Sequence, residues 1–424
     1  MSKIVADNIS PRGSDVTIAG VGTFSSSGVN LTGVVTATSF VGDVTGNATG
    51  LSGSPTLSGI TSVSTSNLTV NGNAYPATGP LSNRNLIING SMQVYQRSGI
   101  STNIVGYHLD RWELGASGGT RAVTQETLTT GSPYDEGFRN YFHLINTGTA
   151  TGASDYRQIM HKIEAQNVAQ SGWNYTSSAS SVTLSFWIRA SVAQTYYVQL
   201  YAPDGTAQNY ASSFSLSADT WTKVTKIIPG NSNLTFNNDN GVGLQIIFVP
   251  FYGTDFTDSG FTTDAWNAYS GSSLLPDMTN TWAGTTNATF DITGVQLEVG
   301  SVATPFEHRS FGDELLRCQR YYQLHSYHGV VGQGQNTDRN SGSYVSFFVP
   351  MRTTPSTIAK TYDVDIGDLN IDFTPNIYTD TYGQALGWRP YRNVSTTITR
   401  GDTMDILANS GTEGGSRHPF NAEL

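Results

Sequence analysis

Cysteine is almost absent from this chain of 424 residues, in which Cys318 is the single example. One cysteine excludes an intrachain disulfide and any metal site built on several thiolates. Charged residues are also scarce, at 13% of the chain, and acidic residues outnumber basic ones by 32 to 22. Because nucleic-acid backbones and anionic membrane surfaces are bound by clustered Lys and Arg, we expect neither partner.

Long apolar stretches are missing as well. No run approaches the roughly 18 consecutive apolar residues of a membrane-spanning helix. The first ten residues, MSKIVADNIS, lack the apolar core of a secretory signal peptide. We therefore expect synthesis in the cytoplasm without a signal peptide, and no insertion into a membrane.

Glycine and aromatic residues are abundant, with 45 Gly, 21 Tyr, 18 Phe and 7 Trp. Disordered chains are typically highly charged and poor in aromatic residues, so this composition predicts a chain that packs. Short apolar alternations between segments rich in Gly, Ser, Thr and Asn favour strands and turns over helices. We expect a mainly β protein with about two to four domains.

The first 82 residues differ from the rest of the chain. Between residues 16 and 82, Asp43 is the single charged residue, and apolar pairs such as Val16 and Ile18 alternate with small residues. Each apolar run is long enough for one brief strand only. One copy therefore buries too little apolar surface to offset the cost of ordering its backbone, about 1–2 kcal/mol per residue.

Two arrangements remain for residues 16–82: a flexible low-complexity linker, or several copies that wind together and share one core. The spaced β-branched residues favour the second, because a plain Gly/Ser linker needs none. Since homo-oligomers are usually closed and symmetric, we predict an intertwined trimeric β shaft. Residues 1–15 hold four of the five charges of this region and are predicted to attach the shaft to a larger assembly.

Residues 83–311 are predicted to form an antiparallel β-sandwich. In VTLSFWIRA, residues 182–190, every second residue from Val182 to Ile188 is apolar, which is typical of a strand with one buried face. Residues 156–163 fit the spacing of a helix and also that of a strand. The other predicted strands are 85–89, 196–201, 221–228, 243–249 and 288–299.

Residues 312–424 begin with the one convincing helix, GDELLRCQRYYQL, for which Asp313 is the predicted N-cap. The segment contains no Gly or Pro after its first residue. The remainder is predicted to be a distal β-rich domain with strands 344–350, 362–366, 369–373 and 395–399.

Several phrases that follow one another in a fixed order are more specific than composition. The chain contains NRNLIINGSMQVYQRSG, YHLDRWEL, IEAQNVAQSGW, VTLSFWIRAS, WTKVTKIIPG and FDITGVQLEVGSVATPFEHRSFGDELLRCQRYYQ. This order closely resembles tail-fibre and receptor-binding proteins of tailed bacteriophages, in the domain with a carbohydrate-binding-module-like jelly roll. The resemblance covers roughly residues 83–323, and VTATSFVGDVTGNATG resembles the repetitive shafts of cyanophage fibres. Beyond residue 323 only VPMRTTPS and FNAEL look familiar, together with RCQRYY just before it.

The resemblance implies a homotrimeric fibre that is part of the virion. Its N-terminal end would join the phage tail or baseplate, and its distal end would contact polysaccharide or lipopolysaccharide on the host surface. It also implies a strand at residues 156–163, because IEAQNV lies where the family has β structure. The loops after Pro250 match no pattern of the family, so no ligand contact is carried over to them.

Catalytic chemistry has weak support in the sequence. Residues 115–119, GASGG, have the spacing of a hydrolase nucleophile elbow, but the following RAVTQETL favours a strand where that motif needs a helix. Glycoside hydrolysis needs two carboxylates about 5–9 Å apart. The pairs Asp255/Asp258 and Asp363/Asp365 fit exposed turns and strands equally well. We expect a protein without enzymatic activity; a glycan depolymerase and a purely structural tail connector are the alternatives.

We predict no cofactor and no metal site. His325 and His328 lie close together in the sequence, and NNDNG at residues 237–241 is rich in oxygen ligands, but it lacks the regularly spaced acids of a calcium loop. Some jelly-roll relatives do hold a structural Ca²⁺. The favoured interpretation is a pair of surface histidines and an ordinary Asn–Gly turn.

Aromatic residues carry the binding prediction. Their rings combine a flat apolar body with a polar edge, which suits the apolar C–H faces of sugars. Trp112, Trp187 and Trp221 lie inside motifs of the resemblance and are assigned to structure. Loop-like sequence in the middle and distal domains supplies the candidate glycan contacts, which are Trp266, Tyr269, Trp282, Tyr378, Tyr382, Trp388 and Tyr391.

Overall fold

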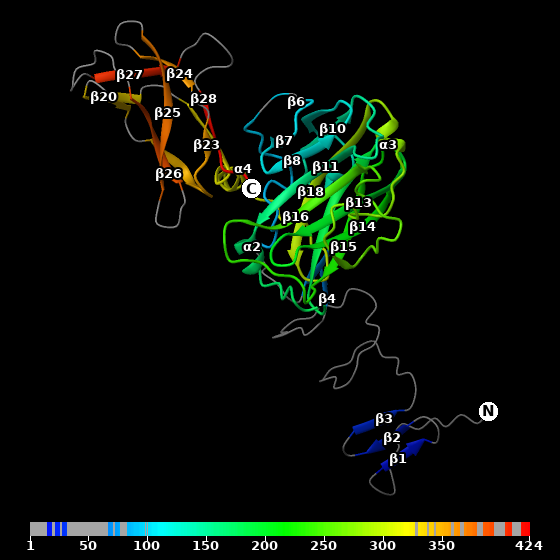
Figure 1. Cartoon of the computed structure of the whole chain (residues 1–424). Coiled ribbons are helices and arrows are strands. Elements are labelled where there is room, and N and C mark those ends of the chain that lie inside the picture. The colour runs from blue at the N-terminus through cyan, green and yellow to red at the C-terminus, as the bar shows by residue number, and fades with distance from the viewer. Residues whose placement is uncertain are drawn as a thin grey trace. The chain divides into compact units, whose positions relative to one another are not determined.

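The computed structural model describes residues 83–97, 99, 101–326, 345–357 and 417–424. Outside these ranges it describes individual β-strands only. Residues 1–64 and 65–424 form two compact units (Figure 1). Among the described helices, none has the length and apolar character needed to cross a membrane.

Short antiparallel strands are what the structure describes before residue 83. β1 (Asp15–Ile18), β2 (Gly22–Ser25) and β3 (Gly28–Leu31) form one sheet, and β4 (Asn67–Val70) pairs with β5 (Asn73–Pro76). Each strand has four residues, which confirms the prediction of brief strands. The intertwined trimer stays a prediction, because the structure is that of a single chain.

Two antiparallel sheets between residues 101 and 299 form the predicted β-sandwich (Figure 1). The six-stranded sheet has the order β15-β12-β18-β10-β9-β6, and the seven-stranded sheet has the order β17-β14-β13-β16-β11-β8-β7. The chain crosses between the sheets at most connections, so neighbouring strands are distant in sequence. In chain order the strands are β6 (Ser101–Thr102), β7 (Gly106–Leu109), β8 (Trp112–Ser117), β9 (Ala122–Thr127), β10 (Asn140–Asn146), β11 (Tyr156–Glu164), β12 (Ser181–Ala190), β13 (Gln194–Ala202), β14 (Gln208–Leu216), β15 (Thr222–Pro229), β16 (Val242–Tyr252), β17 (Trp266–Ala268) and β18 (Ala288–Val299).

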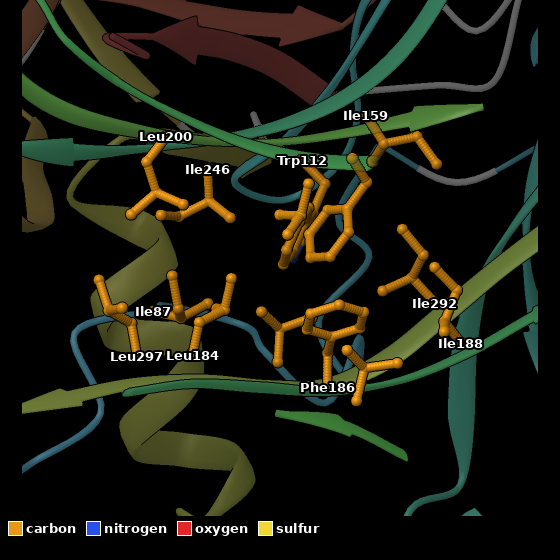
Figure 2. Packing of buried hydrophobic residues seen from close by; sticks show 14 of the residues in the cluster. Ile87, Trp112, Ile159, Leu184, Phe186, Ile188, Leu200, Ile246, Ile292 and Leu297 are labelled. Atoms are coloured by element: carbon orange, nitrogen blue, oxygen red, sulfur yellow. The ribbon is translucent and has the colours of Figure 1, made fainter. Parts of the chain in front are cut away.

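Apolar side chains from both sheets fill the space between them, as Figure 2 shows. Burying one large apolar side chain stabilises a fold by about 1.5–3 kcal/mol. The predicted alternation in β12 is confirmed, since Phe186 and Ile188 are fully buried in this core while Arg189 reaches the opposite face. The seven-stranded sheet contributes Trp112, Ile159, Leu200 and Ile246, which face Leu184, Phe186, Ile188, Ile292 and Leu297 of the other sheet.

Residues 85–89 do not form the predicted strand. Asn89 and Met92 have left-handed backbone angles, with φ of 59° and 57°, and a strand cannot continue through such residues. A side chain replaces part of the missing ladder, because Asn85 Oδ1 accepts hydrogen bonds from the backbone N–H groups of Ile87 and Leu297. The sequence pattern NLIIN is therefore a buried irregular segment.

Residues 156–164 form a strand, β11, as the resemblance implied. Three short helices lie in the connections of the sandwich: α1 (Ser132–Asp135), α2 (Ala165–Ala169) and α3 (Thr281–Gly284). Because α2 begins directly after β11, the last four residues of the phrase IEAQNV are helical, and the expectation of β structure there was wrong.

The predicted helix after residue 311 is α4 (Phe311–Gln319), with two corrections. Its N-cap is Ser310, whose Oγ accepts a hydrogen bond from the backbone N–H of Asp313 at 3.1 Å, so Asp313 itself is not the cap. The helix also ends earlier than predicted. Tyr322–Ser326 is a strand, β19, which pairs with Arg417–Asn421, β28.

The distal region is rich in strands, as predicted. A seven-stranded antiparallel sheet has the order β21-β20-β27-β24-β25-β26-β22, and β19, β28 and β23 form a second, three-stranded sheet. The predicted strand 395–399 lies outside the described residues. The remaining strands are β20 (Val330–Asn336), β21 (Arg339–Gly342), β22 (Val345–Met351), β23 (Ser356–Thr357), β24 (Lys360–Val364), β25 (Leu369–Thr379), β26 (Ala385–Asn393) and β27 (Thr403–Ala408).

The chain returns to the sandwich after the distal sheet, through residues 417–424. The Glu423 carboxylate forms ion pairs with Arg111, which is almost fully buried, and with Arg97 at 3.1 Å. Burial disfavours the charged guanidinium, but the groups around it, Glu423 foremost, together outweigh burial and raise the pKa of Arg111 above its ordinary value. The Arg111 guanidinium also lies 3.5 Å above the ring centroid of Tyr321. We call this set of contacts the neck.

Replacing Glu423 by Gln should destabilise the protein. The exchange leaves the Arg111 charge buried without its carboxylate, and breaking a buried ion pair typically costs about 3–5 kcal/mol. Urea unfolding of the full chain measures the loss. The control is Glu126→Gln at an exposed position of β9, where a change within about 0.5 kcal/mol is expected. Equal stability of the two variants would contradict the role of the neck.

His161 should make the fold sensitive to mild acid. It is buried against Trp112, with ring centroids 5.1 Å apart, and burial together with the nearby Arg111 charge holds its pKa well below the usual value. The unfolded chain therefore takes up a proton below about pH 6.5 that the folded chain excludes. The contribution of His161 to stability is therefore complete above that pH and falls by about 1.4 kcal/mol per pH unit below it.

Urea unfolding between pH 7 and pH 5 measures this slope. We expect the slope to decrease in His161→Gln and to stay as in the parent after His308→Gln, because His308 is exposed. A slope that the His161 exchange leaves unchanged would assign the acid sensitivity to other groups.

Candidate functional site

A row of side chains, half-exposed except for one buried carboxylate, crosses the outer face of the six-stranded sheet. Cross-strand register places Arg189 of β12 opposite Asp291 of β18, and Asp291 opposite His143 of β10. Trp221 directly precedes β15 and lies under the Arg189 guanidinium, 4.9 Å from ring centroid to Cζ. Tyr141 of β10 completes the set. We call these five residues the platform.

The aromatic rings of the platform are arranged edge to face. The ring centroid of Tyr141 lies 5.5 Å from that of Trp221, at an interplanar angle of 83°, and 5.8 Å from that of His143, at 87°. Arg189 also lies 5.5 Å from the Tyr141 centroid. Both Tyr141 and Trp221 remain half-buried, so parts of their rings are available to a ligand.

A buried carboxylate fixes the polar groups of the platform. The Asp291 side chain is fully buried and accepts from Arg189 Nε at 2.8 Å and Nη2 at 2.7 Å, while its other oxygen lies 2.6 Å from His143 Nδ1. Burial lowers the pKa of Arg189, but the Asp291 carboxylate more than compensates and raises it, so the guanidinium stays charged. The side chains of Arg189 and His143 keep 29% and 16% exposure.

Trp187 lies beside the platform but belongs to packing. It is buried in a small cluster with Leu128 and Phe138, and its Nε1 donates to a Glu136 carboxylate oxygen at 3.0 Å. Lys223 forms an exposed ion pair with the same carboxylate at 2.9 Å. The structural assignments of Trp187 and of the fully buried Trp112 are confirmed. Trp221 is instead half-exposed on the platform.

The middle-domain aromatics predicted to contact glycan are not brought together. Trp266 of β17 packs beside Tyr210, with centroids 5.4 Å apart, and its Nε1 donates to the Pro229 carbonyl at 2.8 Å. Tyr269 is 43% exposed and lies 4.6 Å, centroid to centroid, from Tyr201 of the seven-stranded sheet. The assignment of Trp282 needs correction. It is fully buried in α3, where it offers no surface to a ligand.

Three of the four distal aromatics occupy strands where loops were expected. Register places Tyr378 of β25 opposite Gly387, and Tyr391 and Trp388 of β26 opposite Thr374 and Ile377. Tyr378 shares a face of the sheet with its cross-strand partner, position 387. Positions 387 and 391 are four residues apart on β26, so they also share a face. Tyr378 and Tyr391 therefore stand at positions of one face. Trp388 stands at a position of the other face. Tyr382 lies outside the described residues.

The other candidate motifs have structural roles. Residues 115–119 lie at the end of β8, where Gly118 and Gly119 turn the chain with positive φ, as expected for a chance match. Asp255 and Asp258 are exposed in a loop, and one Asp258 oxygen accepts from the backbone N–H of Gly260. Asp363 lies in β24, and Asp365 lies outside the described residues.

The residues considered as possible metal ligands make ordinary contacts where they are described. His325 is buried, which corrects the surface assignment; its Nε2 lies 2.8 Å from Gln323 Oε1, and burial lowers its pKa to about 4. His328 lies outside the described residues. In the turn at 237–241, Asp239 accepts from the backbone N–H of Gly241. Over the described part of the chain, no three His, Cys, Asp or Glu residues are grouped to hold a metal ion.

None of the five platform residues was predicted from the sequence as a ligand contact, and Trp221 was assigned to structure. One signal could have found Arg189, because the period of β12 places it on the face opposite to Phe186 and Ile188. Asp291 is 102 residues from Arg189 in the sequence, and His143 is 148 residues from Asp291. Only strand pairing makes these residues neighbours.

Comparisons with known proteins give structural likeness alone. No protein-family model matches the sequence, and no curated protein matches it. Among solved structures, the enzymatically active domain of tailspike protein 4 of bacteriophage CBA120 is 14% identical, with a TM-score of 0.27 over 53% of this chain and 24% of that one.

Two carbohydrate-binding modules are similarly distant. A structure described as CBM4 is 16% identical, with a TM-score of 0.25 over 50% of this chain and 97% of that one. The family 11 module of the cellulosomal cellulase Lic26A-Cel5E of Clostridium thermocellum is 10% identical, with a TM-score of 0.24 over 51% and 100%. All three TM-scores are below 0.5.

Proposed function

We propose that this chain is a structural fibre protein of a bacteriophage virion, which recognises host surface glycan without cleaving it. The ordered sequence motifs support the phage assignment. The observation that carries the binding role is the platform, in which half-exposed Tyr141 and Trp221 stand beside an arginine held by a buried carboxylate.

Glycan is the ligand class that suits this surface best. The apolar C–H face of a sugar ring can lie on Trp221 or Tyr141, while its hydroxyl groups meet Arg189 and His143. Asp291 holds both polar groups in place before a ligand arrives, so little side-chain freedom is lost on binding. The Arg189 charge is balanced by Asp291, which favours neutral sugars over strongly anionic polymers.

Trp221→Ala should weaken binding to purified host surface polysaccharide. Losing the contact area of one half-exposed ring costs about 1.5 kcal/mol, which corresponds to about a tenfold rise in Kd. Isothermal titration with the polysaccharide measures the change, and an unchanged thermal midpoint confirms that the fold is intact. The matched control is Tyr269→Ala, which removes an exposed ring from the other sheet.

The control also decides between the two sheets. Weaker binding after Tyr269→Ala together with unchanged binding after Trp221→Ala would contradict the platform and move the site to the seven-stranded sheet. If neither variant changed the Kd for the polysaccharide, the sandwich would have no part in glycan recognition.

The proposed assembly is a homotrimer. Residues 1–15 would join the phage tail or baseplate, and the virion would be the site of the protein. Three copies would present three platforms, so contacts that are weak one at a time would add through avidity. We also propose that the distal sheet contacts the host polysaccharide or lipopolysaccharide, with Tyr378 and Tyr391 as the pair that register places on one face.

The glycan depolymerase alternative requires a free carboxylate pair beside the ligand. Asp291, the carboxylate of the platform, is already committed to Arg189 and His143. We therefore expect no new reducing ends when the full chain is incubated with host polysaccharide under conditions in which it binds. Steady release of reducing ends would contradict the proposed non-enzymatic role while leaving glycan recognition in place.

A further inference from the structure

The outer surface of α4 exposes two large apolar side chains next to the point where the N-terminal region joins the sandwich. We propose that this surface packs against a second copy of the same chain in the fibre. The inference rests on the proposed trimer and names the surface that closes it.

α4 is held firmly on its inner side. Glu314 accepts a hydrogen bond from the backbone N–H of Asn89 and forms an ion pair with Arg309 at 3.4 Å. Cys318, one turn further along, is fully buried. Directly after the helix, Arg320 pairs with the buried carboxylate of Glu164 at 2.8 Å. The outer side chains of α4 are therefore presented by a rigid element.

The outer side of α4 exposes two large apolar side chains where solvent would favour polar residues. Phe311 is 57% exposed and Leu316 is 48% exposed. Leu316 also lines a cavity of about 580 Å³ together with Val349 and Pro350 of β22. A single exposed apolar residue needs no explanation, but two on one short helix are unusual. The adjoining cavity combines Leu316, Val349 and Pro350 with a charged rim that includes Arg309 and Arg320, and an apolar patch rimmed by polar residues is typical of a protein interface.

The position of Asn83 identifies the partner. Its Oδ1 accepts a hydrogen bond from Arg317 of α4 at 2.8 Å, and Asn83 lines the same cavity as Leu316. The preceding residues, 16–82, are those predicted to wind around a common axis with two other copies. Each copy of residue 83 must then lie near that axis. A helix bonded to residue 83 consequently faces the neighbouring copies, and a second copy of this chain is the occupant.

The test uses the full chain with a cysteine at position 316. The native Cys318 is fully buried, so Leu316→Cys supplies the accessible thiol on α4. If α4 lies in the interface, a maleimide reagent should label this thiol about tenfold more slowly than the thiol of Ile104→Cys. Ile104 is the matched control, because it is 56% exposed in the connection between β6 and β7. Sedimentation equilibrium gives the mass of each variant.

The outcomes separate this inference from the proposed function. A trimer with protected Leu316→Cys supports both. A trimer in which Leu316→Cys and Ile104→Cys are labelled at equal rates overturns the interface and leaves the trimer standing. A monomer overturns both, and protection of Leu316→Cys in that monomer would mean that residues of the same chain cover the helix. Leu316→Glu provides a second measurement: the trimer should dissociate at a higher concentration than the Ile104→Glu control, and equal dissociation would count against the interface.

Discussion

The ion pair between Arg111 and Glu423 decides how the chain is arranged after the sandwich. A guanidinium with almost no exposure cannot remain without a counter-charge, so the residues after β28, which include Glu423, have to return to the sandwich. β28 then pairs with β19, and the distal sheet becomes a closed insertion between these two strands. Phrases of the distal region that resemble phage fibres, RCQRYY, VPMRTTPS and FNAEL, all lie in or next to β19, β23 and β28. Two of these phrases supply residues of the neck: RCQRYY contains Tyr321, and FNAEL contains Glu423.

The same strand period builds the core and the platform of the sandwich. In β12, Phe186 and Ile188 point between the sheets, where Phe186 lies 4.9 Å from Phe248, centroid to centroid. Trp187 and Arg189 therefore occupy the opposite face. A shift of register by one residue would expose the apolar set and bury the charge. The core thus fixes the face on which Arg189 meets Asp291, and the platform needs no structural element of its own.

Local patterns predicted much of the fold, because alternation identifies a strand with one buried face. The prediction was wrong where side chains replace backbone pairing, as in residues 85–89, where Asn85 satisfies the N–H groups that a ladder would use. It was also wrong for Trp282 and His325, whose flanking sequence resembles an exposed loop or surface. Their burial depends on tertiary packing, since Trp282 donates to the Thr289 carbonyl at 2.9 Å and His325 stacks on Phe348 at 4.5 Å. The platform could not be predicted, because no local signal reports which outward-facing residues become neighbours across strands.

The neck and the platform place different limits on sequence change. Inside a closed insertion, the entropic cost of added residues grows only with the logarithm of loop length, so the distal sheet can vary without disturbing the sandwich. The platform has no such freedom, since each of its residues belongs to or adjoins a strand whose other face forms the core. In the proposed fibre, a constant and weak affinity for sugar would therefore come from the sandwich. Discrimination between hosts would come from the distal sheet.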